Sequence, residues 1–266
     1  EHIDVADTLN WIGVIHLDWT LFKKAEKSFL DSLKIIEKNL GRENKQTTDV
    51  LYNLGSSYVG LGNYEKAEKL FYEILEIDNK LLGENHPESA HVLISLADLY
   101  AEQGLFQQSE PLLLNALEIF NKSQDREMDR FTTLRTLGTL YSQMGLIEKA
   151  ETIYLRLIDE QQKILGANHE ETLFSQLYLI DFYIAEGFYK KAEKISLNIL
   201  SLKEKKLIKK PRMIAKVLQT LGLVYKVQGQ YKKSLDTYLE SIYIHEKAFG
   251  KDHPENSFYY LSLGYA

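Results

Sequence analysis

The sequence predicts an all-α protein, an α-solenoid of six full repeated helix pairs plus a half repeat. One column of mostly small residues steps by 42, 42, 41, 42, 42 and 42 positions and consists of Gly13, Gly55, Ala97, Gly138, Ile180, Gly222 and Gly264. A second column in the same register consists of Ala25, Ala67, Ser109, Ala150, Ala192 and Ser234. Two independent columns in one phase indicate repeated units that bury their apolar faces against one another.

The second copy, Val50–Ala90, is the template for the other copies. Leu51, Leu54 and Tyr58 fall at helical spacing and predict a first helix with these side chains in the core. The spacing resumes after a short break and predicts a second helix over Glu65–Leu82, with core positions Ala67, Leu70, Phe71, Ile74 and Leu75. Small residues in both columns let the two helices lie close together.

Between the two helices, a glycine such as Gly62 ends the first helix, where a positive φ is needed that glycine adopts without a Cβ clash. The first copy has Thr20 at this place, so its turn is expected to differ. We also expect the neighbouring ring of Trp19 to fill the space left by the missing glycine; the alternative is an exposed ring that anchors a ligand.

The fifth copy departs from the small column, because Ile180 stands where the other copies have glycine or alanine. Extra bulk in a tight helix contact costs about 1–3 kcal/mol unless the neighbours repack. Ser196 replaces the large Phe71 or Tyr154 of other copies. We therefore expect Ser196 to make room for Ile180; the alternative is that the superhelix opens locally.

The repeating order of leucine, small residue, tyrosine, glycine, aromatic residue and alanine resembles the tetratricopeptide repeat (TPR), a helix–turn–helix unit. The unit here is longer than the usual ~34 residues, and the junctions Leu82–Pro87, Leu165–His169 and Phe249–Pro254 resemble the kinesin-light-chain subtype. The resemblance covers all 266 residues. It implies a right-handed superhelix whose concave surface is lined mainly by the first helices.

The sequence lacks a linker-like stretch, so we expect one array over residues 1–266. Its repeats run at about 6–47, 48–89, 90–130, 131–172, 173–214 and 215–256, with a half repeat at 257–266. Both ends interrupt a repeat, so the chain is expected to be a fragment of a longer protein. The sequence has no cysteine, no long apolar run and no signal-peptide pattern, which favours a cytoplasmic protein without membrane contact.

Turning the template helix so that its leucines point inward leaves Asp49, Tyr52, Ser56 and Val59 toward a groove. The peptide-binding residues predicted from the equivalent and neighbouring positions are Asp7, Asn10, Asp49, Tyr52, Asn53, His91, Asp98, Arg135, Asp181, Lys216, Gln219 and Lys226. The first half of this set is acidic and the second half is mostly basic, which favours an extended peptide of opposite charge order. The alternative is that these are solvated polar positions without a ligand.

Residues 188–233 carry thirteen Lys and Arg against two Glu, in a chain of formal net charge −6. Such a basic strip could attract nucleic acid or an acidic partner. Many of these lysines alternate with apolar residues along one predicted outer helix, which is typical of a solvated face. Because no aromatic stacking platform accompanies the strip, nucleic acid is an unlikely partner.

The sequence predicts no catalytic, cofactor or metal site, and therefore no enzyme. Its junction histidines, His86 with His91, and His2, His169 and His253, are scattered one per junction, which is the placement of capping or loop-packing residues and not of a metal cluster. We expect a protein–protein interaction module that binds a peptide or partner segment in its groove. The alternative is a sensor or regulatory arm of a larger effector, a nucleotide-dependent switch or a protease, whose other domains lie outside these residues and could also be its partners.

Overall fold

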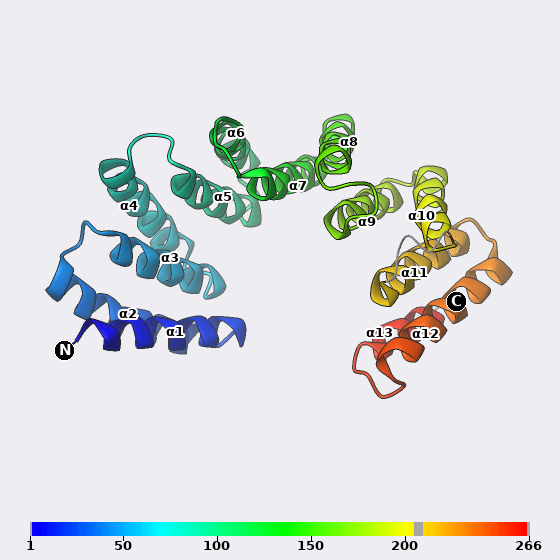
Figure 1. Ribbon diagram of the computed structural model, residues 1–266, viewed down its shortest axis with the longest axis horizontal. Helices are drawn as coiled ribbons and strands as arrows, with labels where there is room; N and C mark the ends of the chain where they lie inside the picture. The colour runs from blue at the N-terminus through cyan, green and yellow to red at the C-terminus, as the bar shows by residue number, and fades with distance from the viewer. Residues whose placement is uncertain (1, 205–209, 265–266) are drawn as a thin grey trace. The chain divides into compact units, whose positions relative to one another are not determined.

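A computed structural model describes residues 2–204 and 210–264 of the chain (Figure 1). These residues form thirteen helices and no strand. The helices are α1 (Ile3–Asp18), α2 (Phe22–Leu40), α3 (Lys45–Gly60), α4 (Tyr64–Leu82), α5 (Pro87–Glu102), α6 (Phe106–Lys122), α7 (Glu127–Gln143), α8 (Ile147–Ile164), α9 (Glu170–Ala185), α10 (Tyr189–Glu204), α11 (Pro211–Val227), α12 (Tyr231–Phe249) and α13 (Asn256–Gly264). The predicted fold class, an all-α solenoid of repeated helix pairs, is confirmed.

The chain packs as two compact units, Glu1–Leu140 and Tyr141–Ala266, which divide within α7. In the first unit, α1, α3 and α5 form one layer and α2, α4 and α6 form the other, as Figure 1 shows. Each helix pair packs on the next, and α3 contacts both α2 and α4. A single array over residues 1–266 stays a prediction.

The core of each pair consists of the side chains that the helical spacing selected. In the template pair, Leu51 and Leu54 of α3 are buried, as are Phe71 and Ile74 of α4. Tyr58 is buried to 8% exposure, so its ring adds a large apolar surface where two pairs meet. Burial on one side of each helix leaves the opposite side available to solvent or to a ligand.

The turns between the helices of a pair have the backbone conformation expected of glycine. Gly62 has a φ of 72°, and the glycines at the equivalent positions 104, 145, 187 and 229 lie between 71° and 78°. The prediction that the first turn differs is wrong, because Thr20 adopts a φ of 56° there. The backbone hydrogen bonds agree as well: Leu21 donates to His16, just as Asn63 donates to Tyr58.

Trp19 does not fill a gap beside this turn. Its side chain is 68% exposed, so the expectation that its ring packs in place of a glycine is also wrong. Thr20 leaves no gap, because the chain follows the same path with a threonine as with a glycine. The cost falls on the backbone of Thr20, since a β-branched residue at positive φ is strained.

The junction histidines cap the first helices. In His2, His86, His169 and His253, ring nitrogen Nδ1 accepts a hydrogen bond from the backbone N–H two residues later, at 3.2–3.3 Å. Each bond satisfies one of the N–H groups that lack a partner at the start of a helix. The capping role predicted for these residues is confirmed.

None of the helices in the described part of the chain is long and apolar enough to cross a membrane.

Candidate functional site

Four of the predicted groove residues surround one pocket in the first unit. They are Asp49, Tyr52 and Asn53 on α3 and His91 on α5. The pocket has a volume of about 320 Å³, and α4 contributes Asp78 to its lining. We call this the α3–α5 pocket. Helical spacing alone predicted that these side chains share a face. It did not predict the pocket, because α4 also forms part of its lining.

Two hydrogen bonds between neighbouring pairs hold the walls of this pocket. Asn53 donates from Nδ2 to Oδ1 of Asn10 on α1, at 3.0 Å. The hydroxyl of Tyr52 lies 2.8 Å from Oγ of Ser95 on α5. Both bonds join first helices of successive pairs, so α1, α3 and α5 are linked side by side by polar groups of the predicted face. The hydrogen bond between Asn10 and Asn53 therefore positions the pocket wall, and it uses only part of the hydrogen-bonding capacity of the two side-chain amides.

Charged side chains that line the α3–α5 pocket form ion pairs with one another. The Nζ atom of Lys45 lies 3.0 Å from Asp49 and 3.7 Å from Glu88, and Glu88 also lies 3.3 Å from Arg126. Partial burial lowers the pKa of Lys45, but the hydrogen bond to Asp49 and the neighbouring carboxylates outweigh it, so the net pKa is raised. Lys45 is about half exposed, which leaves its side chain room to move.

Asp78 is the most deeply buried charged group in this pocket, with 1% of the residue exposed. Its Oδ1 atom has no hydrogen-bond partner among the described residues. Burial raises the pKa of this carboxyl, Lys45 opposes that shift, and Glu88 and Asp49 add to it. The sequence analysis missed Asp78 because it stands on a second helix, at a core position of the repeat. An acidic residue in a column of core residues was the signal that could have revealed it.

Asp98 lies seven residues after His91, about two helical turns further along the same face of α5. Asp98 is exposed at the surface. The surrounding protein nevertheless removes part of the water that would solvate a free carboxylate. This desolvation, with the charge of Glu102, raises the pKa of Asp98 to about 6. Because water still reaches part of the carboxyl, the effect on stability is smaller than for a fully buried group.

The remaining predicted groove residues are distributed over both units. Asp7, Arg135 and Lys226 are partly exposed on first helices. Gln219 is 7% exposed, and its Nε2 donates to Oγ of Ser262 on α13 at 2.7 Å. Gln219 therefore joins two first helices of the second unit. This hydrogen bond corresponds to the one between Tyr52 and Ser95 in the first unit.

The second unit holds a larger and more apolar pocket. It has a volume of about 760 Å³ and is lined by α9, α11, α13 and the end of α12. Among its lining residues are the predicted Asp181 and Lys216, with exposed rings of Phe174, Tyr178 and Phe258. We call this the α9–α13 pocket.

Charges around the α9–α13 pocket are matched within the protein. Lys210 pairs with Glu170, and Arg212 pairs with Glu255 at 2.6 Å. Nζ of Lys216 lies 5.1 Å from the ring centroid of Phe258. The pKa of Asp181 is raised by burial, and the charge of Lys216 opposes that shift. This pocket therefore offers apolar surface rather than uncompensated charge.

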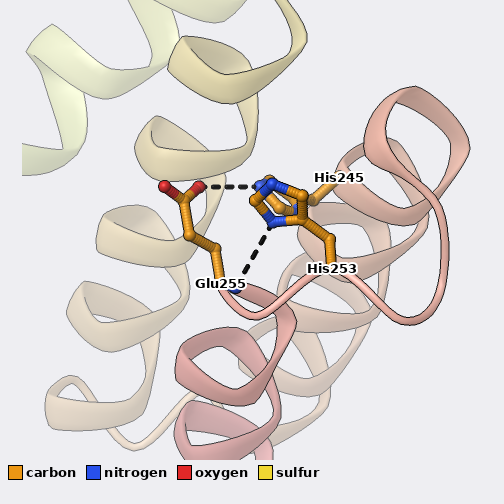
Figure 2. Close-up of side chains that lie close together, drawn as sticks. All are labelled: His245, His253 and Glu255. Atoms are coloured by element: carbon orange, nitrogen blue, oxygen red, sulfur yellow. Dashed lines mark hydrogen bonds and ion pairs between the residues drawn. The ribbon is translucent and has the colours of Figure 1, made fainter.

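A cluster of His245, His253 and Glu255 near the start of α13 was also missed from the sequence (Figure 2). Their possible metal-ligand atoms all lie within 4.8 Å of one another, and no other group of three such side chains does so in the described residues. His245 is completely buried, and its Nε2 lies 3.2 Å from Oε2 of Glu255. Three such groups at this separation have the chemistry of an incomplete zinc site.

Each member of this cluster already has a structural partner. His253 caps α13 through Nδ1, and Glu255 pairs with Arg212. The amide of Asn256 donates to Gly250 and Lys251, so its Oδ1 accepts from Nδ1 of His245 at 2.6 Å. These bonds explain the cluster as the link that fastens α12 to α13. To act as a metal ligand through Nε2, neutral His253 would have to give up its cap.

The basic strip at residues 188–233 contributes to packing where it is described. A lysine lies over the ring of the repeated tyrosine in four helix pairs, at 4.9–5.3 Å: Lys66 over Tyr58, Lys149 over Tyr141, Lys191 over Tyr183 and Lys233 over Tyr225. Two of these lysines belong to the strip. Such contacts stabilise the pair by cation–π attraction. Lys205, Lys206 and Lys209 lie outside the described residues.

Comparison with solved structures shows the fold. A putative kinesin light chain from Podosopora anserina with TPR-like repeats is 22% identical, with a TM-score of 0.66, and the match covers 77% of this chain and 98% of that one. A STAND signal-transduction ATPase with a tetratricopeptide repeat sensor, from Pyrococcus horikoshii, is 20% identical with a TM-score of 0.72. That match covers 98% of this chain and 38% of the ATPase chain.

A third similar structure is a Rap protein complexed with Competence and Sporulation Factor, at 14% identity and a TM-score of 0.60. It covers 97% of this chain and 73% of the Rap chain. At these identities the likeness shows the fold alone. No curated protein matches this chain.

Family models described as tetratricopeptide repeat match residues 4–79, 46–122, 131–171 and 214–255. These matches together cover more than half of the sequence. The chain therefore belongs to the tetratricopeptide repeat family, with a fold of the kinesin-light-chain-like type.

Proposed function

We propose that this chain is a protein–protein interaction module that binds a peptide or partner segment along the face of its first helices. The observation that carries the proposal is the convergence of Asp49, Tyr52, Asn53 and His91 on the α3–α5 pocket. A merely solvated face would scatter its polar groups over a convex surface. Here they surround a hollow whose walls are fixed by hydrogen bonds between neighbouring first helices.

The charge of this face in the first unit favours a basic ligand. Asp49 and Asp98 are exposed acidic groups on neighbouring first helices. Opposite charge on a peptide would steer its approach and fix its register. The Rap structure provides a precedent for this fold in complex with another molecule, named as Competence and Sporulation Factor. Peptide binding by this chain is our extension of that precedent.

Predicted groove residues of the second unit would contribute in a different way. Asp181 and Lys216 line the α9–α13 pocket, which is largely apolar and has matched charges. We expect apolar side chains of a ligand to bind there. Gln219 is engaged between α11 and α13, so its contribution would be to the shape of the face.

Selection from a random peptide library displayed on phage tests this function. The wild-type chain should retain a recognisable set of peptides, enriched in Lys or Arg. The variant Asp49→Lys/Asp98→Lys should lose that set, since it reverses the charge on the proposed face. A matched control is Asp31→Lys/Glu76→Lys, which makes the same change of charge at exposed positions on α2 and α4.

The control should retain the same peptides as the wild type. Loss of binding in both double variants would show that net charge alone attracts the peptides. A library that yields no consensus with the wild-type chain would overturn the proposed function. Circular dichroism of each variant separates loss of binding from loss of fold, because all four substituted side chains are exposed.

A sensor or regulatory arm of a larger effector is the second candidate. The observation that favours it is the likeness to the STAND ATPase, which is described as having a tetratricopeptide repeat sensor. Peptide binding and sensing are compatible, since a sensor must bind what it detects. The sequence of the gene on both sides of these residues tests the second role. A cytoplasmic location stays a prediction of the sequence.

A further inference from the structure

We propose that the α3–α5 pocket binds one cationic side chain, an arginine or lysine of the bound peptide, which forms an ion pair with Asp78. This inference rests on the proposed function and makes it more specific. It depends on three features of the pocket: a buried carboxylate whose Oδ1 atom has no hydrogen-bond partner among the described residues, an excess of negative charge, and a size that suits one side chain.

Asp78 occupies a position where the fold does not need an acid. In four of the five other pairs the equivalent residues are Ile36, Phe120, Gln161 and His245, all buried to 1% exposure or less. Ile36 and Phe120 show that an apolar side chain satisfies the packing there. A buried carboxylate with an unpartnered oxygen is destabilising. An acid in this column is therefore explained better by binding than by folding.

Negative charge exceeds positive charge in the lining of the pocket. Asp49, Asp78 and Glu88 contribute carboxylates, and Lys45 contributes an ammonium group. Lys45 pairs with Asp49 and Glu88, and its charge also acts on Asp78, although no ion pair or hydrogen bond joins the two side chains among the described residues. Oδ1 of Asp78, which has no hydrogen-bond partner among those residues, is thus left for a cation from outside. The half-exposed Lys45 can move away from the mouth when that cation enters.

The dimensions of the pocket favour an organic cation over a metal ion. Its volume of about 320 Å³ is at the lower end of the ~300–1,000 Å³ range of ligand sites, which suits one side chain. A divalent metal would require several carboxylate oxygens converging on one point. The three carboxylates of this pocket do not converge in that way, since the described residues bring such atoms together only at His245, His253 and Glu255.

The walls would hold the cation in a defined orientation. Tyr52 and Asn53 are fixed by their bonds to Ser95 and Asn10, so they present rigid sides to the pocket. The ring of His91 is positioned by packing 5.3 Å from the ring of Phe120. An aliphatic stem could lie along these groups while its charged end reaches Asp78. Long basic side chains bury their stems in this way.

A titration followed by ¹H–¹⁵N NMR tests the inference with a defined probe. The probe is N-acetyl-arginine methylamide, and its neutral control is N-acetyl-citrulline methylamide, which has nearly the same shape without the charge. The arginine probe should produce saturable shifts at the amides of Asp49, Asn53, Asp78 and His91. The citrulline probe should bind at least about tenfold more weakly, because the buried carboxylate would gain no opposite charge.

The variant Asp78→Asn should lose this preference for the arginine probe while keeping or increasing its melting temperature. Asp78→Ile, which copies Ile36, provides a second variant if the first is poorly folded. Asp31→Asn on the exposed surface of α2 is the matched control and should titrate like the wild type. Equal shifts with both probes, shifts outside the pocket, no shifts, or unchanged binding by Asp78→Asn would overturn the inference.

The outcome is distinguishable from that of the library selection. Selected peptides that depend on Asp49 and Asp98 but contain no basic residue would disprove the role of Asp78 and leave the proposed function standing. Specific binding of the arginine probe with no selected peptide would support the pocket and overturn the peptide-binding module.

Discussion

Gly55 on α3 lies directly against the ring of Phe71 on α4. A Cβ atom added at Gly55 would stand 2.8 Å from Cε1 of Phe71, closer than two carbon atoms can approach without movement. Gly13 with Phe29 and Gly222 with Tyr238 repeat this contact, each sixteen residues apart. The glycine column is therefore the space into which a ring from the second helix packs.

Gly55→Ala should lower the free energy of unfolding by about 1 kcal/mol. Displacement of the ring costs about 1–3 kcal/mol, and the better helix propensity of alanine returns close to 1 kcal/mol. In the background of Phe71→Leu the same alanine should be stabilising, because the third pair accommodates Ala97 with Leu113, both fully buried. Urea unfolding of the four proteins measures this change of sign. Equal effects of the alanine in both backgrounds would refute the account.

The fifth pair has the large and small residues exchanged at the two corresponding positions. Ile180 and Ser196 stand sixteen residues apart and are both completely buried. Compensation of Ile180 by Ser196 stays a prediction. Ile180→Gly should lower the free energy of unfolding by about 2–5 kcal/mol, because it leaves a cavity beside a small serine. Adding Ser196→Phe should recover part of that loss. A rise in melting temperature on Ile180→Gly alone would show that the contact is strained.

Thr20→Gly should raise the free energy of unfolding by about 1 kcal/mol. Thr20 is exposed and has a φ of 56°. A left-handed conformation costs a β-branched residue about 1–3 kcal/mol, partly offset by the greater freedom of glycine in the unfolded chain. The reverse change at the equivalent turn, Gly62→Thr, should be destabilising. Thermal unfolding of both variants measures the two effects. Destabilisation by Thr20→Gly, or stabilisation by Gly62→Thr, would contradict the conclusion that Thr20 is strained.

Asp98 should titrate near pH 6, as measured by NMR of its carboxyl carbon. Its pKa in the folded chain lies above the unfolded value of ~3.9, so the protonated form favours folding. That contribution is complete below about pH 4 and is lost as pH rises through 6. Asp98→Asn should therefore match the wild type at pH 4 and be more stable at pH 7. An ordinary carboxyl pKa near 4 would show that water solvates this face freely.

The sequence predicted the repeat because small residues and turn glycines recur where helices touch or end. The backbone conformation at a helix contact or a helix end depends on the residue at that position. The spacing of these residues was therefore enough to predict the helix pairs. Thr20 shows the limit of this reasoning. The first turn has the same backbone hydrogen bonds and the same positive φ as the other turns, even though the local residue disfavours that conformation.

The candidate site was predictable only in part, for a physical reason. Asp49, Tyr52, Asn53 and His91 lie on first helices, whose exposed faces follow from helical periodicity. Asp78 belongs to a second helix and reaches the pocket between two first helices, a relation that depends on how three helices pack. Gln219 was predicted to face the groove, but its contact with α13 depends on the approach of the next pair.

The central claim is that the first-helix face binds a peptide through its acidic side chains. The most direct measurement is the dissociation constant of one selected basic peptide, by titration calorimetry, for the wild type, Asp49→Lys/Asp98→Lys and Asp31→Lys/Glu76→Lys. We predict at least about tenfold weaker binding for the first variant and a small change for the second. Equal loss in both variants, or no loss in either, would contradict the claim.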